Sequence, residues 1–329
     1  MLFYPTLAAL IATFTIALML RWGAAGPLDL PNQRSLHATP VPRSGGVGIM
    51  AGVMVGFVAE APAFTFIAGL LLLTLVSWWD DRRSLPVAVR FACHFVAAGL
   101  VVAAVFPDVA IWNLLLALLF IVWMTNLYNF MDGANGLAGG MAVFGFGAYA
   151  VAAGMADAAG MAGAMALAVW AACIAAAALG FLLFNFDPAR IFMGDVGSIP
   201  LGFLAASLGL VGIQREVWPL WFPVLVFAPF IVDATMTLLR RAWRREKIWQ
   251  AHREHYYQRL VCSGWSHRKL ALHEYALMAA ISASACWMLG WPPVAQAAGL
   301  AVWLLVLGGL MRKIDGLAIK VAKSAPGIE

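Results

Sequence analysis

Four aspartates stand at the ends of apolar stretches in a mostly hydrophobic chain. Asp80 and Asp81 close the run TLVSWWDDRRS, Asp132 closes NLYNFMDG, and Asp195 lies within IFMGDVGSIPLGF. A carboxylate near hydrocarbon depth costs on the order of a few kcal/mol, so by default it marks a functional site. Carboxylates that share one aqueous face are suited to holding Mg²⁺ against phosphates. The aspartates therefore predict a metal and phosphate site on one side of a membrane.

Two neighbouring motifs add amide side chains to these acids. Asn126, Asn129 and Asp132 recur at a spacing of three, which places them on one face if the segment is helical. Amide oxygens and carboxylates are ligands for metals and nucleotides, and the glycines that follow allow a close backbone approach. Polar packing between helices, with a glycine hinge, is the structural alternative for this motif.

The segment FNFDPARIFMGDVGS gathers further polar residues around a proline turn. Asp195 or Ser198 precedes an apolar stretch and would also be a good helix N-cap. Capping would explain one of these two residues. It would not explain why Asn185, Asp187 and Arg190 accompany them beside a membrane.

The acidic pair and a basic segment each allow two interpretations. Asp80 and Asp81 could bind a cation, or they could form a solvated helix end. The segment HREHYYQRL (residues 252–260) is called the histidine loop below; its His252 and His255 share a face if helical. Arg253 and Arg259, in the same loop, could hold a diphosphate or a lipid phosphate. The alternative for the loop is contact with anionic lipid.

Three weaker features complete the candidates. The segment PNQRSLHATPVPRSGGVG offers Arg34, His37 and Arg43 to a phosphate. Asp233 is a further acid inside an apolar stretch. His94 is expected to be a packed, hydrogen-bonded histidine.

The composition predicts an all-α integral membrane protein. Of the 329 residues, 63% are hydrophobic and 11% are charged. Apolar runs of roughly 18 residues or more recur along the chain, and strand alternation typical of a β-barrel is absent. The four cysteines form neither a zinc motif nor a disulfide framework. About eleven helical spans are expected, near 2–20, 45–61, 64–79, 87–106, 109–128, 136–153, 160–183, 198–213, 218–239, 271–290 and 294–311.

The distribution of basic residues predicts the orientation of these spans. With the N-terminus outside, every one of the 21 Lys and Arg residues except Arg215 falls in a cytoplasmic segment or the C-terminal tail. The same topology puts the C-terminus and the four aspartates on the cytoplasmic side. We expect one membrane-embedded domain over residues 1–329, because the basic cytoplasmic loop at about 240–270 is too short to fold alone.

A secondary transporter and a non-catalytic membrane scaffold are alternatives to an enzyme. A secondary transporter also uses intramembrane acids, but it predicts charges near the midplane and two-fold internal symmetry. No inverted repeat is evident, and the acids collect at one face. A non-catalytic membrane scaffold would leave the polar motifs unexplained.

Taken in order, the motifs resemble the polyprenyl-phosphate N-acetylhexosamine-1-phosphate transferase family, the enzymes related to MraY and WecA. The matching pieces are PNQRSLHATPVPRSGG, WWDDRRSLPVAVRF, NLYNFMDGANGLAGG, FNFDPARIFMGDVGS and the histidine loop. The resemblance implies transfer of a sugar-1-phosphate from a UDP-sugar to undecaprenyl phosphate, releasing UMP, with Mg²⁺ or Mn²⁺ as cofactor. It also implies a bacterial inner membrane location and a cytoplasmic active site.

The resemblance assigns roles to particular residues. It implies metal ligation by Asp195 and Asn129, and it puts Asp80 and Asp81 at the acceptor phosphate. Asn185 and Phe192 match uracil-binding positions. The full set of catalytic candidates is Asp80, Asp81, Asp132, His252, His255 and Arg90. The substrate-binding candidates are Asn126, Asn135, Asn185, Phe192, Arg253 and Arg43.

The histidine loop departs from the three-histidine run of MraY and looks most like the WbpL-type branch. That branch initiates O-antigen or other surface glycans from UDP-N-acetyl-6-deoxyhexoses, so the donor is either such a sugar or a UDP-N-acetylhexosamine. No nucleic-acid partner is expected, and both a monomer and a homodimer remain open. Direct attack by the lipid phosphate is favoured over a covalent aspartyl intermediate, because a phosphate monoester is largely dianionic at neutral pH.

Overall fold

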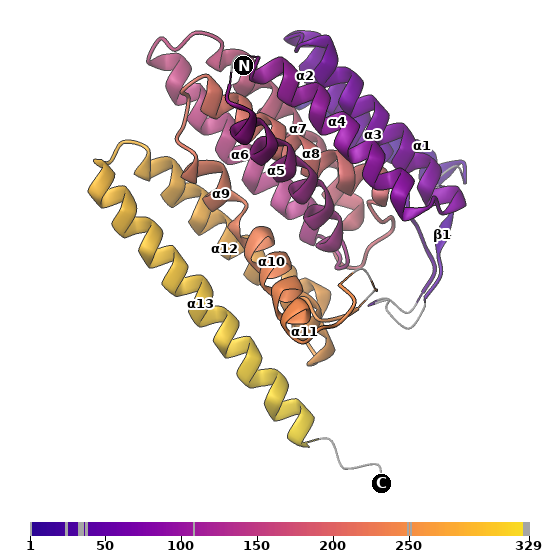
Figure 1. Cartoon of the computed structure of the whole chain (residues 1–329). Helices are drawn as coiled ribbons and strands as arrows, with labels where there is room; N and C mark the ends of the chain where they lie inside the picture. Colours follow the sequence, from indigo (N-terminus) through magenta and orange to yellow (C-terminus); the bar gives the residue numbers. More distant parts are fainter. Residues whose placement is uncertain are drawn as a thin grey trace.

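The computed structural model describes residues 2–23, 26–31, 36, 39–107, 109–248, 250 and 252–324, so Arg34 and His37 lie outside the described residues. This part of the chain is nearly all helical (Figure 1), as predicted. The strands β1 (Leu28–Asp29) and β2 (Val41–Pro42) form an antiparallel pair. The helices are α1 (Phe3–Arg21), α2 (Gly45–Ala59), α3 (Phe64–Arg83), α4 (Val87–Val105), α5 (Ile111–Phe130), α6 (Leu137–Ala158), α7 (Ala164–Asn185), α8 (Asp195–Gln214), α9 (Trp221–Val226), α10 (Ala228–Trp243), α11 (Tyr256–Cys262), α12 (His267–Met288) and α13 (Pro293–Ser324).

Eight helices of the described chain are long and apolar enough to cross a membrane, namely α1, α3 to α8 and α13. At about 1.5 Å per residue, a 20-residue helix matches the roughly 30 Å hydrocarbon core of a bilayer. The predicted spans 45–61 and 271–290 correspond to the shorter apolar α2 and to α12. These features make the protein a multi-pass membrane protein.

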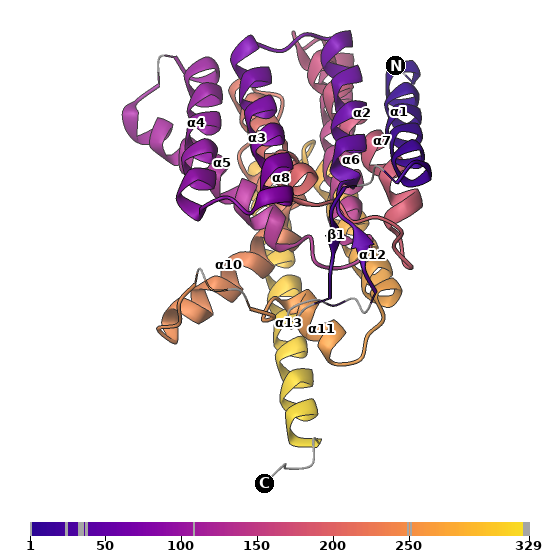
Figure 2. The ribbon, with the colours of Figure 1, turned by 90° about the vertical axis from the view of Figure 1, so that its right-hand side faces the viewer.

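The predicted continuous span 218–239 is wrong, because the structure divides it into α9 and α10 at Phe227. Pro229 explains the break. It has no N–H to donate to Leu225, and its ring would clash with that carbonyl group in an unbroken helix. Figure 2 shows α10 leaving the bundle at its lower end and running out to the side. The break therefore brings the polar residues of α10 beneath the bundle.

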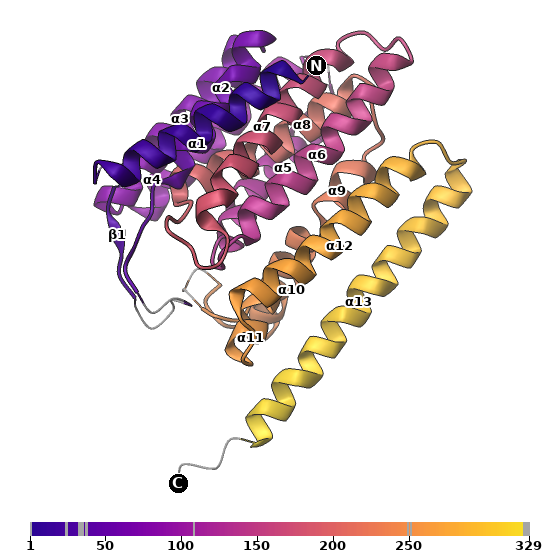
Figure 3. The ribbon, with the colours of Figure 1, turned by 180° about the vertical axis from the view of Figure 1, so that it is seen from behind.

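The core of the bundle is built around α8. Its membrane-spanning window is 94% buried, whereas that of α13 is 6% buried. Figure 3 shows α13 along the outer side of α12, at the edge of the molecule. Small residues allow close packing near the start of α8, where a Cβ on Gly46 would lie 2.3 Å from the Cα of Gly197. The position of α8 is therefore fixed on all sides.

The helix ends that carry the aspartates meet at one end of the bundle. The ends of α3, α5 and α7, the start of α8, the β1–β2 hairpin and α11 gather there, away from the N-terminus (Figure 1). Asp132 and Asp195 line one pocket, and Asp81 is bonded to the backbone of Asp195. The prediction that the aspartates share one side is confirmed.

Candidate active site

The first turn of α8 is held by a carboxylate from another helix. Asp81, near the end of α3, accepts hydrogen bonds from the backbone N–H groups of Asp195 (3.2 Å) and Val196 (3.0 Å). Arg43 donates to the same carboxylate at 2.8 Å, and only 1% of the Asp81 side chain is exposed. First-turn N–H groups lack partners within their own helix and favour negative charge. Asp81 therefore joins α3 and the segment after β2 to the start of α8.

The alternative in which Asp195 or Ser198 caps α8 is wrong. Gly194 occupies the N-cap position, and no side chain of that residue or its neighbours makes the usual cap bond. The Ser198 hydroxyl instead donates to the side-chain oxygen of Asn129 at 2.7 Å. Because Asp81 does the capping, the carboxylate of Asp195, which is 21% exposed, is free to face the pocket.

Asp80 is also held by partners from its surroundings. One of its oxygens accepts from the backbone N–H of Leu85, and the other accepts from Arg90 at 3.0 Å. The same guanidinium group lies 3.7 Å from a carboxylate oxygen of Asp195. Arg90 therefore links Asp80 to Asp195 from behind the pocket.

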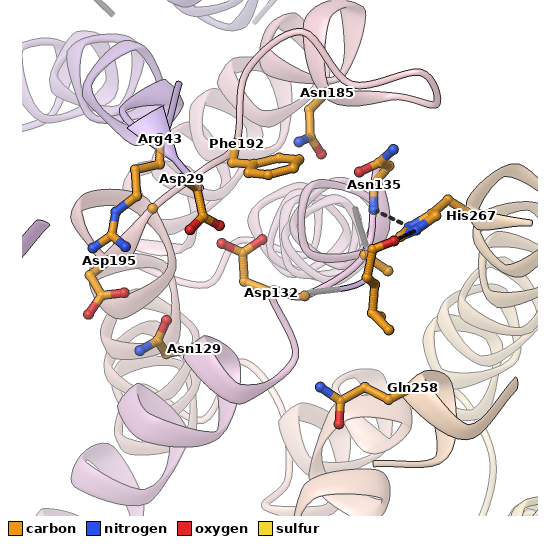
Figure 4. A pocket seen from close by; sticks show the side chains of 14 residues that line it. Asp29, Arg43, Asn129, Asp132, Asn135, Asn185, Phe192, Asp195, Gln258 and His267 are labelled. Carbon is orange, nitrogen blue, oxygen red and sulfur yellow. Dashed lines mark hydrogen bonds between the residues drawn. The ribbon is translucent and has the colours of Figure 1, made fainter. Parts of the chain in front are cut away.

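A pocket of about 210 Å³ opens between these helix ends (Figure 4). Its walls come from the β1–β2 region, the ends of α5 and α7, the segments that follow α5 and precede α8, and single residues at the start of α8, in α11 and at the start of α12. Seven predicted site residues line it: Arg43, Asn129, Asp132, Asn135, Asn185, Phe192 and Asp195. The structure therefore brings together the predicted metal ligands and most of the predicted nucleotide-binding residues.

Amide side chains hold the loops of this pocket. Asn185 accepts from the backbone N–H of Gly136 at 2.8 Å and donates to the carbonyl oxygen of Ile191 at 2.9 Å. Asn135 donates to a carboxylate oxygen of Asp187, also at 2.8 Å. These bonds join the segment after α5 to the segment after α7, so both loops present a single wall to the pocket.

Asn185→Ala should lower both stability and donor affinity. The substitution leaves a buried N–H of Gly136 and the carbonyl oxygen of Ile191 without their partner, which costs about 1–3 kcal/mol per unsatisfied group. We expect a lower melting temperature in detergent and a raised KM for the nucleotide donor. The matched control is Asn113→Ala, at an exposed position near the start of α5, where both quantities should match the wild type. Unchanged values for Asn185→Ala would contradict the bonding described above.

Electrostatics in the pocket favour a bound cation. Burial raises the pKa of Asp132 well above its usual range, and the carboxylates of Asp195 and Asp81 raise it further. Arg43 acts in the opposite direction. A cation placed among these groups would relieve the repulsion that raises this pKa.

Three polar side chains that line the pocket are not among the residues predicted from the sequence: Asp29, Gln258 and His267. His267 Nδ1 accepts from the backbone N–H of Asn135 at 3.1 Å, so its proton lies on Nε2, which is 3.0 Å from the carbonyl oxygen of Leu36. No local motif marks Asp29 or His267, and Gln258 lies in the histidine loop, where the histidines and arginines are the expected phosphate-binding residues. Only folding brings α12 next to the loop that follows α5.

Asn126 lies away from the pocket. Its side-chain nitrogen donates to the carbonyl oxygen of Val122 at 2.7 Å and lies 3.2 Å from Nδ1 of His94. The expected packing of His94 is confirmed, since this side chain is buried. The polar-packing alternative therefore fits Asn126, whereas Asn129 and Asp132 face the pocket.

The histidine loop lies beside the pocket and reaches it through Gln258. The rings of His252 and His255 are 4.9 Å apart, and His255 is buried. Burial, with the nearby His255 and Arg241 acting in the same direction, lowers the pKa of His252 to about 4. Glu254 pairs with Arg241 and ties the loop to α10. His252 is therefore neutral near pH 7 and can offer a hydrogen bond but no charge.

Comparison with known proteins agrees with these motifs. Residues 63–213 match the family model described as glycosyl transferase family 4. A Bacillus subtilis protein named probable undecaprenyl-phosphate N-acetylglucosaminyl 1-phosphate transferase is 30% identical over 79% of this chain and 76% of its own. A Mycolicibacterium smegmatis protein named decaprenyl-phosphate N-acetylglucosaminephosphotransferase is 30% identical over 91% of this chain and 84% of its own.

A third relative, from Escherichia coli O157:H7, is named undecaprenyl-phosphate alpha-N-acetylglucosaminyl 1-phosphate transferase. It is 27% identical over 79% of this chain and 75% of its own. These names give no support to the transporter alternative. The chain belongs to the polyprenyl-phosphate N-acetylhexosamine-1-phosphate transferases of glycosyl transferase family 4.

Proposed function

We propose that this protein transfers an N-acetylhexosamine-1-phosphate from a UDP-sugar to undecaprenyl phosphate and releases UMP, as the first membrane step of a surface glycan or cell-wall polymer. The observation that carries the proposal is the pocket that Asp195, Asn129 and Asp132 line together at one end of a membrane bundle. The relatives' names supply the classes of donor and acceptor. The distribution of basic residues supports an inner-membrane protein whose pocket faces the cytoplasm.

The pocket residues suit a single Mg²⁺ or Mn²⁺ that is held jointly with substrate. No group of three His, Cys, Asp or Glu side chains in the described part of the chain forms a ready metal cage. Mg²⁺ commonly uses one or two protein ligands, with substrate phosphates and waters completing its shell. Asp195 and Asn129 lie on the same side of the pocket and can serve as those ligands (Figure 4). When bound, the ion would neutralise charge on the diphosphate and the leaving UMP.

The bonding of the acidic pair favours direct attack by the lipid phosphate. All four carboxylate oxygens of Asp80 and Asp81 accept hydrogen bonds. Hydrogen bonds and ion pairs of this kind lower the nucleophilicity of a carboxylate oxygen. The lipid phosphate, with a second pKa near 6, is already largely dianionic at neutral pH. Positioning and charge neutralisation therefore account for the reaction without a covalent aspartyl intermediate.

Release of UMP tests the proposal. Purified protein with Mg²⁺, undecaprenyl phosphate and a panel of UDP-N-acetylhexosamines and UDP-N-acetyl-6-deoxyhexoses should produce UMP only when the lipid acceptor is present. The panel also tests the WbpL-type assignment, which predicts a preference for the 6-deoxy sugars. Folded protein that releases no UMP with any donor would exclude the proposed activity.

His252→Gln should reduce the sensitivity of the fold to acid. The pKa of His252 falls from its ordinary value of 6.5 to about 4 in the folded protein. The unfolded chain therefore binds more protons than the folded protein at pH values between about 4 and 6.5. Stability is therefore lost as the pH falls from about 6.5 towards 4. Melting temperatures at pH 7 and pH 5 should differ less in His252→Gln than in the wild type. An equal difference in the two proteins would show that His252 is not buried as a neutral ring.

A further inference from the structure

A buried aspartate of α10 holds the start of α11, although the proposed chemistry does not use it. Oδ1 of Asp233 accepts from the backbone N–H of Tyr256 at 2.9 Å and lies 3.2 Å from Nδ1 of His255. Oδ2 accepts from the backbone N–H of Tyr257 at 3.0 Å. The hydroxyl of Thr237, one turn further along α10, donates to Oδ1 at 3.2 Å. A carboxylate with 7% exposure is tolerated in a protein only when it is bonded in this way.

The residues that Asp233 holds are themselves stacked against the end of α5. The His255 ring stacks with Phe130, at a centroid distance of 6.1 Å, and with Tyr257, at 6.0 Å. The Tyr257 hydroxyl also donates to the carbonyl oxygen of Phe130 at 3.1 Å. Phe130 ends α5 just before Asp132, and Gln258 lines the pocket. A shift of α11 would therefore reach both walls of the pocket.

We propose that Asp233 is a positioning residue that fixes the His255 ring and the first turn of α11, so that the histidine loop faces the substrate diphosphate. This inference rests on the proposed function, because only there does the loop contact substrate. The helix break at Phe227 contributes to this positioning. It starts α10 below the bundle, where the carboxylate of Asp233 is directed at the histidine loop.

The substitution Asp233→Asn tests this role. The amide group offers one acceptor oxygen in place of two, so it cannot serve the N–H groups of Tyr256 and Tyr257 as the carboxylate does. Loss of a group that orients a functional side chain typically costs about 10- to 100-fold in activity. We expect a fall of that size in kcat for UMP release, with a smaller change in the KM for the donor. The matched control is Glu274→Gln on α12. Glu274 and Asp233 both line a second cavity, separate from the active-site pocket. Among the described residues, Glu274 makes no hydrogen bond to the histidine loop.

A double-mutant cycle separates positioning from general stabilisation. If Asp233 acts through His255, adding Asp233→Asn to His255→Ala should cause little further loss of kcat. Additive losses, or a wild-type kcat in Asp233→Asn, would overturn the inference. An inactive wild-type protein would instead overturn the proposed function, so the two failures are distinguishable.

Amide hydrogen exchange gives a second measurement that does not depend on activity. The N–H groups of Tyr256 and Tyr257 should exchange slowly in the wild type and in Glu274→Gln, and faster in Asp233→Asn. If Asp233→Asn does not fold, the wild-type measurement still tests the inference. Fast exchange at both tyrosines in the folded wild type would overturn it.

Discussion

Asp195→Asn should lower kcat by about 10³-fold, the scale observed when one preorganised electrostatic group is removed from an active site. The substitution keeps the size of the side chain. The backbone N–H of residue 195 still donates to Asp81, so α8 remains anchored. What is lost is the negative oxygen that we assign to the metal ion. The measurement is UMP release at saturating donor and at a Mg²⁺ concentration that just saturates the wild type, together with the melting temperature in detergent.

The control for this change is Asp157→Asn near the end of α6, where the same chemical change lies far from the pocket. Its kcat and melting temperature should both match the wild type. Raising the Mg²⁺ or Mn²⁺ concentration should restore part of the activity of Asp195→Asn, because Asn129 remains as a ligand. Wild-type turnover in Asp195→Asn would remove this residue from the metal site and leave Asp132 and Asp29 as the remaining candidate carboxylates of the pocket.

Much of this site could be predicted because its chemistry lies in short local motifs. Asn129 and Asp132 lie three residues apart in one motif at the end of α5, and Asp195 follows a glycine at the start of an apolar span. A polar residue that interrupts an apolar run has few structural reasons to be there. The basic residues predict an orientation for the spans without any knowledge of how the helices pack.

The parts that were missed depend on long-range contacts. His267 and Asn135 are joined by a hydrogen bond although 132 positions separate them. Asp81 caps α8 from a different helix, and nothing in a local sequence window distinguishes that role from a phosphate-facing one. Pro229 is a local indication of the break before α10, but the apolar composition of 218–239 favours one continuous span.

Asp81→Asn should cost both activity and stability, which separates it from Asp195→Asn. An asparagine has one acceptor oxygen for the N–H groups of Asp195 and Val196, and it leaves Arg43 without its counter-ion. Unsatisfied buried groups and broken ion pairs of this kind cost on the order of 2 kcal/mol or more, although the 33% exposure of Arg43 reduces its share. We therefore expect a clearly lower melting temperature and a large loss of kcat, since the start of α8 carries the proposed metal ligand.

The companion variant for this prediction is Arg43→Met, alone and combined with Asp81→Asn. If the carboxylate acts through its bonds to Arg43 and α8, the two substitutions should be strongly non-additive in melting temperature, because each already removes the ion pair. An Asp81 that acted only on the lipid phosphate would give a different pattern. Asp81→Asn would then have the melting temperature of the wild type. The effects of the two substitutions on the melting temperature would add in the double variant, and Asp81→Asn would lower only kcat. The melting temperatures therefore decide whether the second aspartate of the pair anchors the active-site helix or faces the acceptor.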